Sequence, residues 1–176
     1  MFTKIHQVDS SIIKSVQKLP KEIRPLMIAL TFIGEPLVLL SIVISLTVYM
    51  FINKQASVVK AGFATAVLLL VSPILKIIFQ RSRPAVIFAS INQPKSYSFP
   101  SGHAYMSMLV LGLLAYVAYT RLQQPLGIIV AISLALIIFG IGLSRVYLGV
   151  HYASDVIAGW LVAFVLLVLI IKIFGV

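Results

Sequence analysis

Two histidines and one aspartate stand out in this sequence of 176 residues, because only 10% of its residues are charged. His151 and Asp155 are four residues apart, a spacing that places both side chains on one face of a helix. The carboxylate can then accept a hydrogen bond from Nδ1–H and leave Nε2 free as a nucleophile. His103 belongs to another segment, from which it can act as a general acid on a departing oxygen. The pattern indicates nucleophilic chemistry assisted by an acid.

Three basic residues lie in the same segments and could bind an anion together. Lys76 and Arg83 are seven residues apart, which is one helix face if the helix continues that far, and Arg145 precedes His151. Arginine forks match the geometry of phosphate oxygens. Ser101 and Gly102 precede a predicted helix, whose N-terminus attracts anions, and they add a hydroxyl donor and a close backbone approach. These five residues are the predicted phosphate site.

These residues lie at the ends of apolar segments long enough to cross a bilayer. Hydrophobic residues make up 61% of the chain, and its mean hydropathy is +1.11. A helix of about 20 apolar residues spans the hydrocarbon core. The sequence therefore predicts an all-α fold, a polytopic membrane helix bundle with five transmembrane helices in one domain, residues 26–176. The five apolar runs are 28–52, 61–79, 104–119, 126–143 and 156–171.

The first 25 residues are polar and basic, and they lack the apolar core of a secretory signal. Residues 1–25 are expected to form an amphipathic surface helix, with an N-cap within Asp9 to Ser11 and an end before Pro25. Counting crossings places this helix on the same side of the membrane as the connections 80–103 and 144–151. The candidate residues are therefore expected to meet at one end of the bundle, helped by a turn near Gly149.

Some polar residues have simpler interpretations. Arg81 and Lys95 are expected to lie at the membrane interface, with their charges in the headgroup layer. Glu35 is expected to pair with a base in a structural role, and Pro73 to kink the second span. A metal site is not expected, because two histidines and one carboxylate among cations make a poor divalent-ion site. The chain contains no cysteine, which excludes disulfides and thiolate chemistry.

Three segments of the chain resemble the three signature motifs of the type 2 phosphatidic acid phosphatase family of membrane lipid phosphatases. Lys76 to Pro84 fits KxxxxxxRP, Pro100 to His103 fits PSGH, and Ser144 to Asp155 fits SRxxxxxHxxxD. Every signature position is filled, in the family's order, and the resemblance extends from about residue 30 to the C-terminus. PSGH alone would be weak evidence, but three motifs in register are specific.

The resemblance implies a phosphohydrolase that needs no metal or other cofactor and that works through a phosphohistidine intermediate. It implies that His151 is the nucleophile, Asp155 its orienting partner and His103 the acid. The phosphoryl oxygens would be held by the five residues of the predicted phosphate site. Related soluble haloperoxidases bind vanadate in place of phosphate, so vanadate is expected to inhibit.

The net charge of +10 suits an anionic partner. No interleaved aromatic and basic surface favours nucleic acid, so the expected partners are the membrane and a lipid phosphate substrate. Undecaprenyl diphosphate and phosphatidylglycerol phosphate are preferred over phosphatidate, by analogy with small bacterial relatives. The oligomeric state is left open by the sequence.

Two other functions remain open from the residues alone. An anion transporter or channel could use the same basic cluster, although a conduit needs no nucleophile with an orienting carboxylate. A scaffold or lipid-binding protein on the same fold would not need His103 or His151, and both are present.

Two observations bear on the side of the membrane that carries the site, and they point in opposite directions. That side carries ten of the 14 basic residues, which by the positive-inside rule would place it in the cytoplasm. The bacterial proteins that the chain resembles mostly face outward. We therefore expect an integral protein of the cell (inner) membrane with an extracytoplasmic active site.

Overall fold

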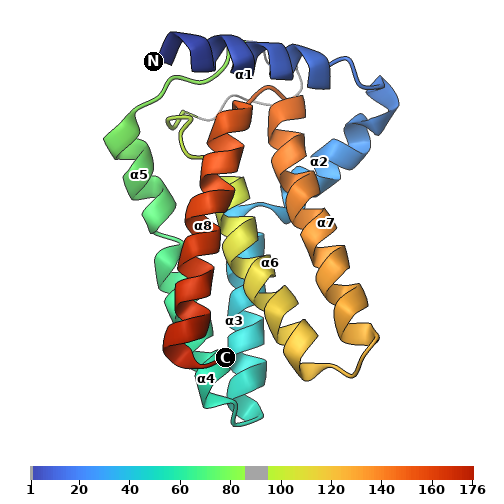
Figure 1. Cartoon of the computed structure of the whole chain (residues 1–176), viewed down its shortest axis with the longest axis vertical. Helices are drawn as coiled ribbons and strands as arrows, with labels where there is room; N and C mark the ends of the chain where they lie inside the picture. Colours follow the sequence, from blue (N-terminus) through green and yellow to red (C-terminus); the bar gives the residue numbers. More distant parts are fainter. Residues whose placement is uncertain (1, 86–94) are drawn as a thin grey trace.

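The computed structural model describes residues 2–85 and 95–176, and every regular element in these ranges is a helix (Figure 1). The predicted all-α class is therefore confirmed. In chain order the elements are α1 (Phe2–Val16), the 3₁₀ helix η1 (Lys21–Ile23), α2 (Arg24–Ile33), α3 (Pro36–Ile52), α4 (Ala56–Leu68), α5 (Val71–Phe79), α6 (Gly102–Arg121), α7 (Leu126–Tyr147) and α8 (Ala153–Phe174).

The first predicted span is not one helix. Residues 21–33 and 36–52 differ in direction by 53°, so the expectation of a continuous helix through 28–52 is wrong. Glu35 has an extended backbone, and Pro36 begins α3 because its fixed φ and missing N–H suit a first helical position. In the described ranges, four helices are long and apolar enough to cross a membrane, or five if this bent pair counts as one span.

The second span is interrupted between α4 and α5. The proline ring at position 73 prevents a regular helix from continuing past the carbonyl of Leu69, as the predicted kink requires. The Tyr105 hydroxyl of α6 donates a hydrogen bond to the Leu68 carbonyl at 2.8 Å. This bond satisfies one of the carbonyl groups that the end of α4 leaves without a partner in the helix, so fewer hydrogen bonds are lost at the break.

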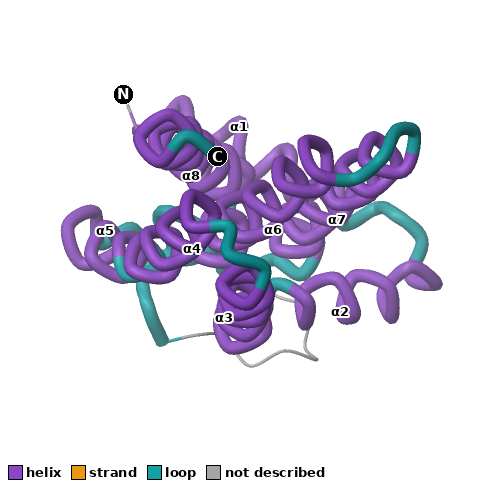
Figure 2. The backbone as a smooth tube through the Cα atoms, turned by 90° about the horizontal axis from the view of Figure 1, so that it is seen from below, coloured by secondary structure: helices purple, strands orange, loops and turns teal. Residues whose placement is uncertain are grey.

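Helix α6 occupies the centre of the bundle and packs against α3, α7 and α8 (Figures 1 and 2). Its buried residues include Tyr105, Leu109 and Leu113. Gly159 lets α8 approach the beginning of α6 closely, because a Cβ there would lie 2.8 Å from the Ser101 carbonyl oxygen. This contact brings the beginnings of α6 and α8 together, and each of them carries predicted site residues.

Helix α1 lies across one end of the bundle and packs against α7 and α8 (Figure 1). It begins at Phe2, so the predicted N-cap at Asp9 to Ser11 is wrong. Asp9 lies inside the helix and is almost fully buried. At the same end, Gly149 has φ +71° in the connection from α7 to α8, which confirms the turn predicted there.

Candidate active site

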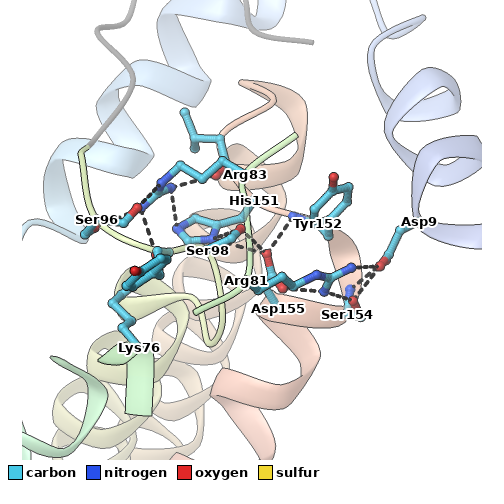
Figure 3. Close-up of polar contacts among 12 residues, drawn as sticks. Asp9, Lys76, Arg81, Arg83, Ser96, Ser98, His151, Tyr152, Ser154 and Asp155 are labelled. Atoms are coloured by element: carbon cyan, nitrogen blue, oxygen red, sulfur yellow. Dashed lines mark hydrogen bonds and ion pairs between the residues drawn. The ribbon is translucent and has the colours of Figure 1, made fainter. Parts of the chain in front are cut away.

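His151 lies in the turn before α8, and Asp155 is in the first turn of that helix (Figure 3). The predicted common helix face is therefore wrong, because α8 begins only at Ala153. Both side chains are buried, and His151 Nδ1 lies 3.5 Å from Asp155 Oδ2. The same carboxylate oxygen accepts a hydrogen bond from the Tyr152 backbone N–H at 3.0 Å. This backbone bond fixes the carboxylate, which can then hold the proton of the imidazole on Nδ1.

Ser98 contacts both members of this pair, and the sequence analysis did not identify it. Its buried hydroxyl donates to Asp155 Oδ2 at 2.5 Å and lies 3.4 Å from His151 Nδ1. Because the hydroxyl hydrogen is committed to the carboxylate, the oxygen can only accept from Nδ1–H. Ser98 and Asp155 therefore favour the same tautomer of His151, with Nε2 unprotonated.

The other ring nitrogen, Nε2, lies 3.2 Å from Arg83 Nη1. Burial lowers the pKa of His151 to about 3; the hydrogen bond to Asp155 opposes this shift, and the positive charges of Arg145 and Arg83 add to it. Burial also lowers the pKa of Arg83. The imidazole is therefore neutral at physiological pH, and its nucleophilic nitrogen points at an arginine that can hold a phosphoryl oxygen.

Lys76 and Arg83 meet, but not along one helix. Helix α5 ends at Phe79, and Gln80 has a left-handed backbone, so the predicted shared helix face is wrong. Instead, Lys76 Nζ donates to the Tyr97 carbonyl at 2.7 Å, and Arg83 Nη2 reaches the same oxygen at 3.3 Å. The loop before α6 thus positions two of the predicted phosphate-binding cations side by side.

Arg145 comes from the last turn of α7 and is 4% exposed. One guanidinium nitrogen, Nη1, donates to the hydroxyl of Thr31 in α2. Its Nε is buried and has no hydrogen-bond partner among the described residues. A buried guanidinium with unused donors is costly unless an anion completes its bonding.

None of these three cations bonds to a carboxylate in the described residues. The whole chain has four acidic residues, and residues 86–94 contain none. Lys76 and Arg83 donate to backbone carbonyls and to a serine hydroxyl, and Arg145 donates to a threonine. Their positive charge is therefore available to an external anion.

His103 is the second residue of α6. Its Nε2 lies 3.3 Å from Glu35 Oε1, at the break between α2 and α3. Glu35 does pair with a basic side chain, as predicted. The partner is His103, the residue predicted to act as the general acid. His103 also lies close enough to Arg145 for the positive charge of that guanidinium to act on it.

Ser101 and Gly102 lie at the beginning of α6, near Asp155 and Lys76, with one difference from the prediction. The Ser101 backbone N–H bonds to the Asp155 carbonyl at 3.0 Å, so it is not free for an anion. Its hydroxyl is buried and has no partner among the described residues. A Cβ on Gly102 would lie 3.4 Å from Ser72 Oγ and 3.8 Å from Lys76 Cε, so glycine leaves that space beside the lysine side chain unfilled.

Arg81 is not the interfacial side chain that was expected. Its guanidinium donates to Asp155 Oδ1 at 2.5 Å and to Asp9 Oδ2 at 2.7 Å (Figure 3). Burial tends to lower the pKa of Arg81, but the hydrogen bond to Asp9 and the charge of Asp155 outweigh it, and the net shift is upward. The only sequence signal was Asp9 itself, one acidic residue within a basic segment.

Metal-ligating side chains do not gather in the described part of the chain: no group of three or more His, Cys, Asp or Glu is placed to hold an ion.

Comparisons with known proteins identify the family and several relatives of this chain. Residues 57–176 match the model of a family described as the PAP2 superfamily. Phosphatidylglycerophosphatase B of Bacillus subtilis is 34% identical over 106 residues, which are 57% of this chain and 50% of the relative. Undecaprenyl-diphosphatase of Sulfolobus acidocaldarius is 31% identical over 144 residues, 77% of this chain and 63% of the relative. The matches thus span less than two thirds of either relative.

Solved structures match over nearly the whole chain. The crystal structure of a transmembrane PAP2-type phosphatidylglycerolphosphate phosphatase from Bacillus subtilis has a TM-score of 0.86 at 27% identity, over 97% of this chain and 86% of that one. LpxE of Aquifex aeolicus has a TM-score of 0.68 at 23% identity, over 92% and 93% of the two chains. At that identity the second match concerns the fold alone.

Proposed function

Because this chain belongs to the PAP2 superfamily, we propose that it is an integral membrane lipid phosphatase that works through a phosphohistidine intermediate and without a metal. One observation carries the proposal: Lys76, Arg83 and Arg145 use only neutral partners, and one of them faces the free nitrogen of His151. An anion that completes this site is held against a nucleophile.

The positions of the side chains are compatible with the reaction that the resemblance implies. His151 Nε2 attacks phosphorus while the bond from phosphorus to the leaving oxygen breaks, and His103 gives that oxygen a proton. Asp155 stabilises the positive imidazole ring that forms. Water then attacks the phosphohistidine, loses a proton to His103, and releases phosphate and free His151.

The basic residues supply the electrostatic stabilisation. Negative charge spreads over the phosphoryl oxygens in the transition state, where fixed cations act without reorganising. Lys76, Arg83 and Arg145 provide that charge, and the Ser101 hydroxyl is a further donor. Gly102 leaves room for an oxygen beside Lys76.

The substrate class is a lipid phosphomonoester or diphosphate. Undecaprenyl diphosphate and phosphatidylglycerol phosphate are preferred, and the names of the curated relatives favour these two lipids over phosphatidate. Only fifteen residues separate Pro84 from Pro100, which is short for a lid that reads a large headgroup. A lipid that enters from the bilayer with its phosphate first suits this geometry.

The test is phosphate release by the purified protein in detergent with a chelator present, on each of the three lipids. His151→Ala and Arg83→Ala are expected to lose activity. Arg121→Ala removes an exposed arginine at the opposite end of α6 and should retain it. Full activity of His151→Ala, or loss of the parent's activity with chelator, would refute the mechanism.

The transporter alternative requires a polar path through the bundle. In the described residues the buried ionisable side chains, Asp9, Arg145, His151 and Asp155, lie at the α1 end, whereas the main core cluster is apolar. Uptake of phosphate into vesicles that contain the protein, with no hydrolysis of any lipid phosphate, would favour the alternative.

We place the site on the extracytoplasmic side of the cell (inner) membrane, as the resemblance implies. The chain has no cysteine, so single cysteines can report sidedness. Lys95 is exposed near the site, and Lys54 is exposed at the other end of the bundle. An impermeant thiol reagent should label Lys95→Cys in intact cells; labelling of Lys54→Cys alone would reverse the assignment.

A further inference from the structure

We propose that Asp9 of the N-terminal helix α1 is a positioning residue of the active site, which acts through Arg81 on Asp155 and His151. The inference rests on the proposed function for its catalytic consequence. In this proposal, α1 contributes a positioning residue to the active site in addition to attaching the protein to the membrane surface.

Asp9 is buried and fully engaged. It is 2% exposed, and its carboxylate accepts hydrogen bonds from three donors of the site region. Oδ2 accepts from Arg81 Nη2 at 2.7 Å and from the Ser154 hydroxyl at 2.6 Å, and Oδ1 accepts from the Ser154 backbone N–H at 3.0 Å. Surface attachment does not need a buried carboxylate, which is costly unless it is paired and bonded.

Arg81 connects Asp9 to the catalytic pair (Figure 3). Its Nη1 bonds to Asp155 Oδ1 at 2.5 Å, while Asp155 Oδ2 faces His151. An arginine that faced Asp155 alone would withdraw negative charge from the carboxylate and weaken its hold on the Nδ1 proton. Asp9 offsets the positive charge of Arg81, because it accepts a hydrogen bond from Nη2 of the same guanidinium.

Asp9 also orders the first turn of α8. The N-cap position of α8 is Tyr152, whose backbone N–H donates to Asp155 Oδ2 in the first turn at 3.0 Å. Asp9 accepts from the N–H of Ser154 in the same turn, so α1 satisfies a further backbone donor at this helix end. Helix α1 also contacts Tyr152, because the tyrosine hydroxyl lies 3.3 Å from His6 Nε2. The Tyr152 ring lies 4.1 Å from the guanidinium of Arg81, the partner of Asp9.

The test compares Asp9→Asn and Asp9→Glu with Glu22→Gln in the full chain. Glu22 is exposed in η1, so the control removes a nearby carboxylate that lies outside the site. Asp9→Asn is expected to lower kcat on the best lipid substrate by about tenfold or more, as for other supporting hydrogen-bond partners, and to change KM less than twofold. Asp9→Glu should recover part of kcat, and Glu22→Gln should match the parent.

A second readout does not depend on turnover. Amide hydrogen exchange of residues 151–155 should quicken in Asp9→Asn relative to the parent and to Glu22→Gln, while exchange in the middle of α7 stays the same. Unchanged exchange, a kcat within twofold of the parent, or a loss confined to KM would overturn the proposal. An inactive parent with the expected exchange pattern would instead reject the proposed function and retain the coupling of α1 to this turn.

Discussion

His151 Nδ1 has two candidate acceptors at nearly equal distance, and a pair of substitutions separates them. Ser98 Oγ lies at 3.4 Å and Asp155 Oδ2 at 3.5 Å. We predict that Asp155→Asn abolishes most activity, whereas Ser98→Ala reduces it only modestly. The physical reason is charge: the carboxylate stabilises the positive ring that forms during attack, and a neutral hydroxyl does so weakly.

The magnitudes follow from the contacts. An asparagine amide can donate to Nδ1 and so select the tautomer with a proton on Nε2, which blocks attack. Loss of an orienting aspartate in this way costs about 10⁴-fold in kcat in a comparable triad. Ser98→Ala removes one hydrogen bond worth about 1 kcal/mol net, or roughly fivefold in rate, because Tyr152 N–H and Arg81 still hold Asp155.

The assay is steady-state phosphate release in detergent, with kcat and KM measured for both variants and folding checked by thermal unfolding. Ser98→Ala should lower kcat less than tenfold and Asp155→Asn at least a thousandfold, with KM nearly unchanged in both. If the serine variant loses as much activity as the aspartate variant, or Asp155→Asn stays within tenfold of the parent, the assignment of Asp155 as the orienting partner is wrong.

Three further predictions concern the surroundings of these residues. Glu35→Gln should lower kcat by at most about fivefold, because the Glu35 side chain is 49% exposed and such pairs contribute about 0–1 kcal/mol, whereas His103→Gln should cost about 10²-fold or more. Thr31→Val removes the partner of buried Arg145, so the free energy of unfolding in detergent should fall by about 1–3 kcal/mol. Since the His151 pKa is lowered to about 3, the folded protein keeps this ring neutral while the unfolded chain protonates it below about pH 6.5. The folded protein therefore has its full free energy of unfolding above pH 6.5, and part of this free energy is lost as the pH falls toward 3. Tm should thus drop more steeply in acid for the parent than for His151→Gln.

Much of the architecture was predictable because the membrane restricts it. Long apolar runs can only be helices in a bilayer, and the runs beginning at 104, 126 and 156 lie within α6, α7 and α8. The turn at Gly149 was also predictable, since a straight helix would separate Arg145 from His151. The bend at Gly34 to Pro36 was not predicted. Hydropathy is averaged over a window of residues, so it does not reveal where backbone hydrogen bonds are lost within an apolar run.

The residues missing from the prediction are those that act through other residues. Ser98 lies in a loop whose path depends on Lys76 and Arg83 bonding to neighbouring carbonyls, and no periodicity encodes that path. Arg81 was interpreted from its local setting alone. Its partners are distant in sequence, and a single sequence does not reveal which of several basic residues a carboxylate selects.

The choice of partners separates Arg81 from the three cations that are proposed to bind phosphate. Asp9 and Asp155 both pair with Arg81, which neutralises its charge and binds α1 to the beginning of α8. Lys76, Arg83 and Arg145 receive no such partner from the chain's four acidic residues. A carboxylate at any of these three would compete with phosphate for the same donors. With both buried carboxylates engaged by Arg81, the positive potential is concentrated beside His151 Nε2, where the attack on phosphorus is proposed to occur.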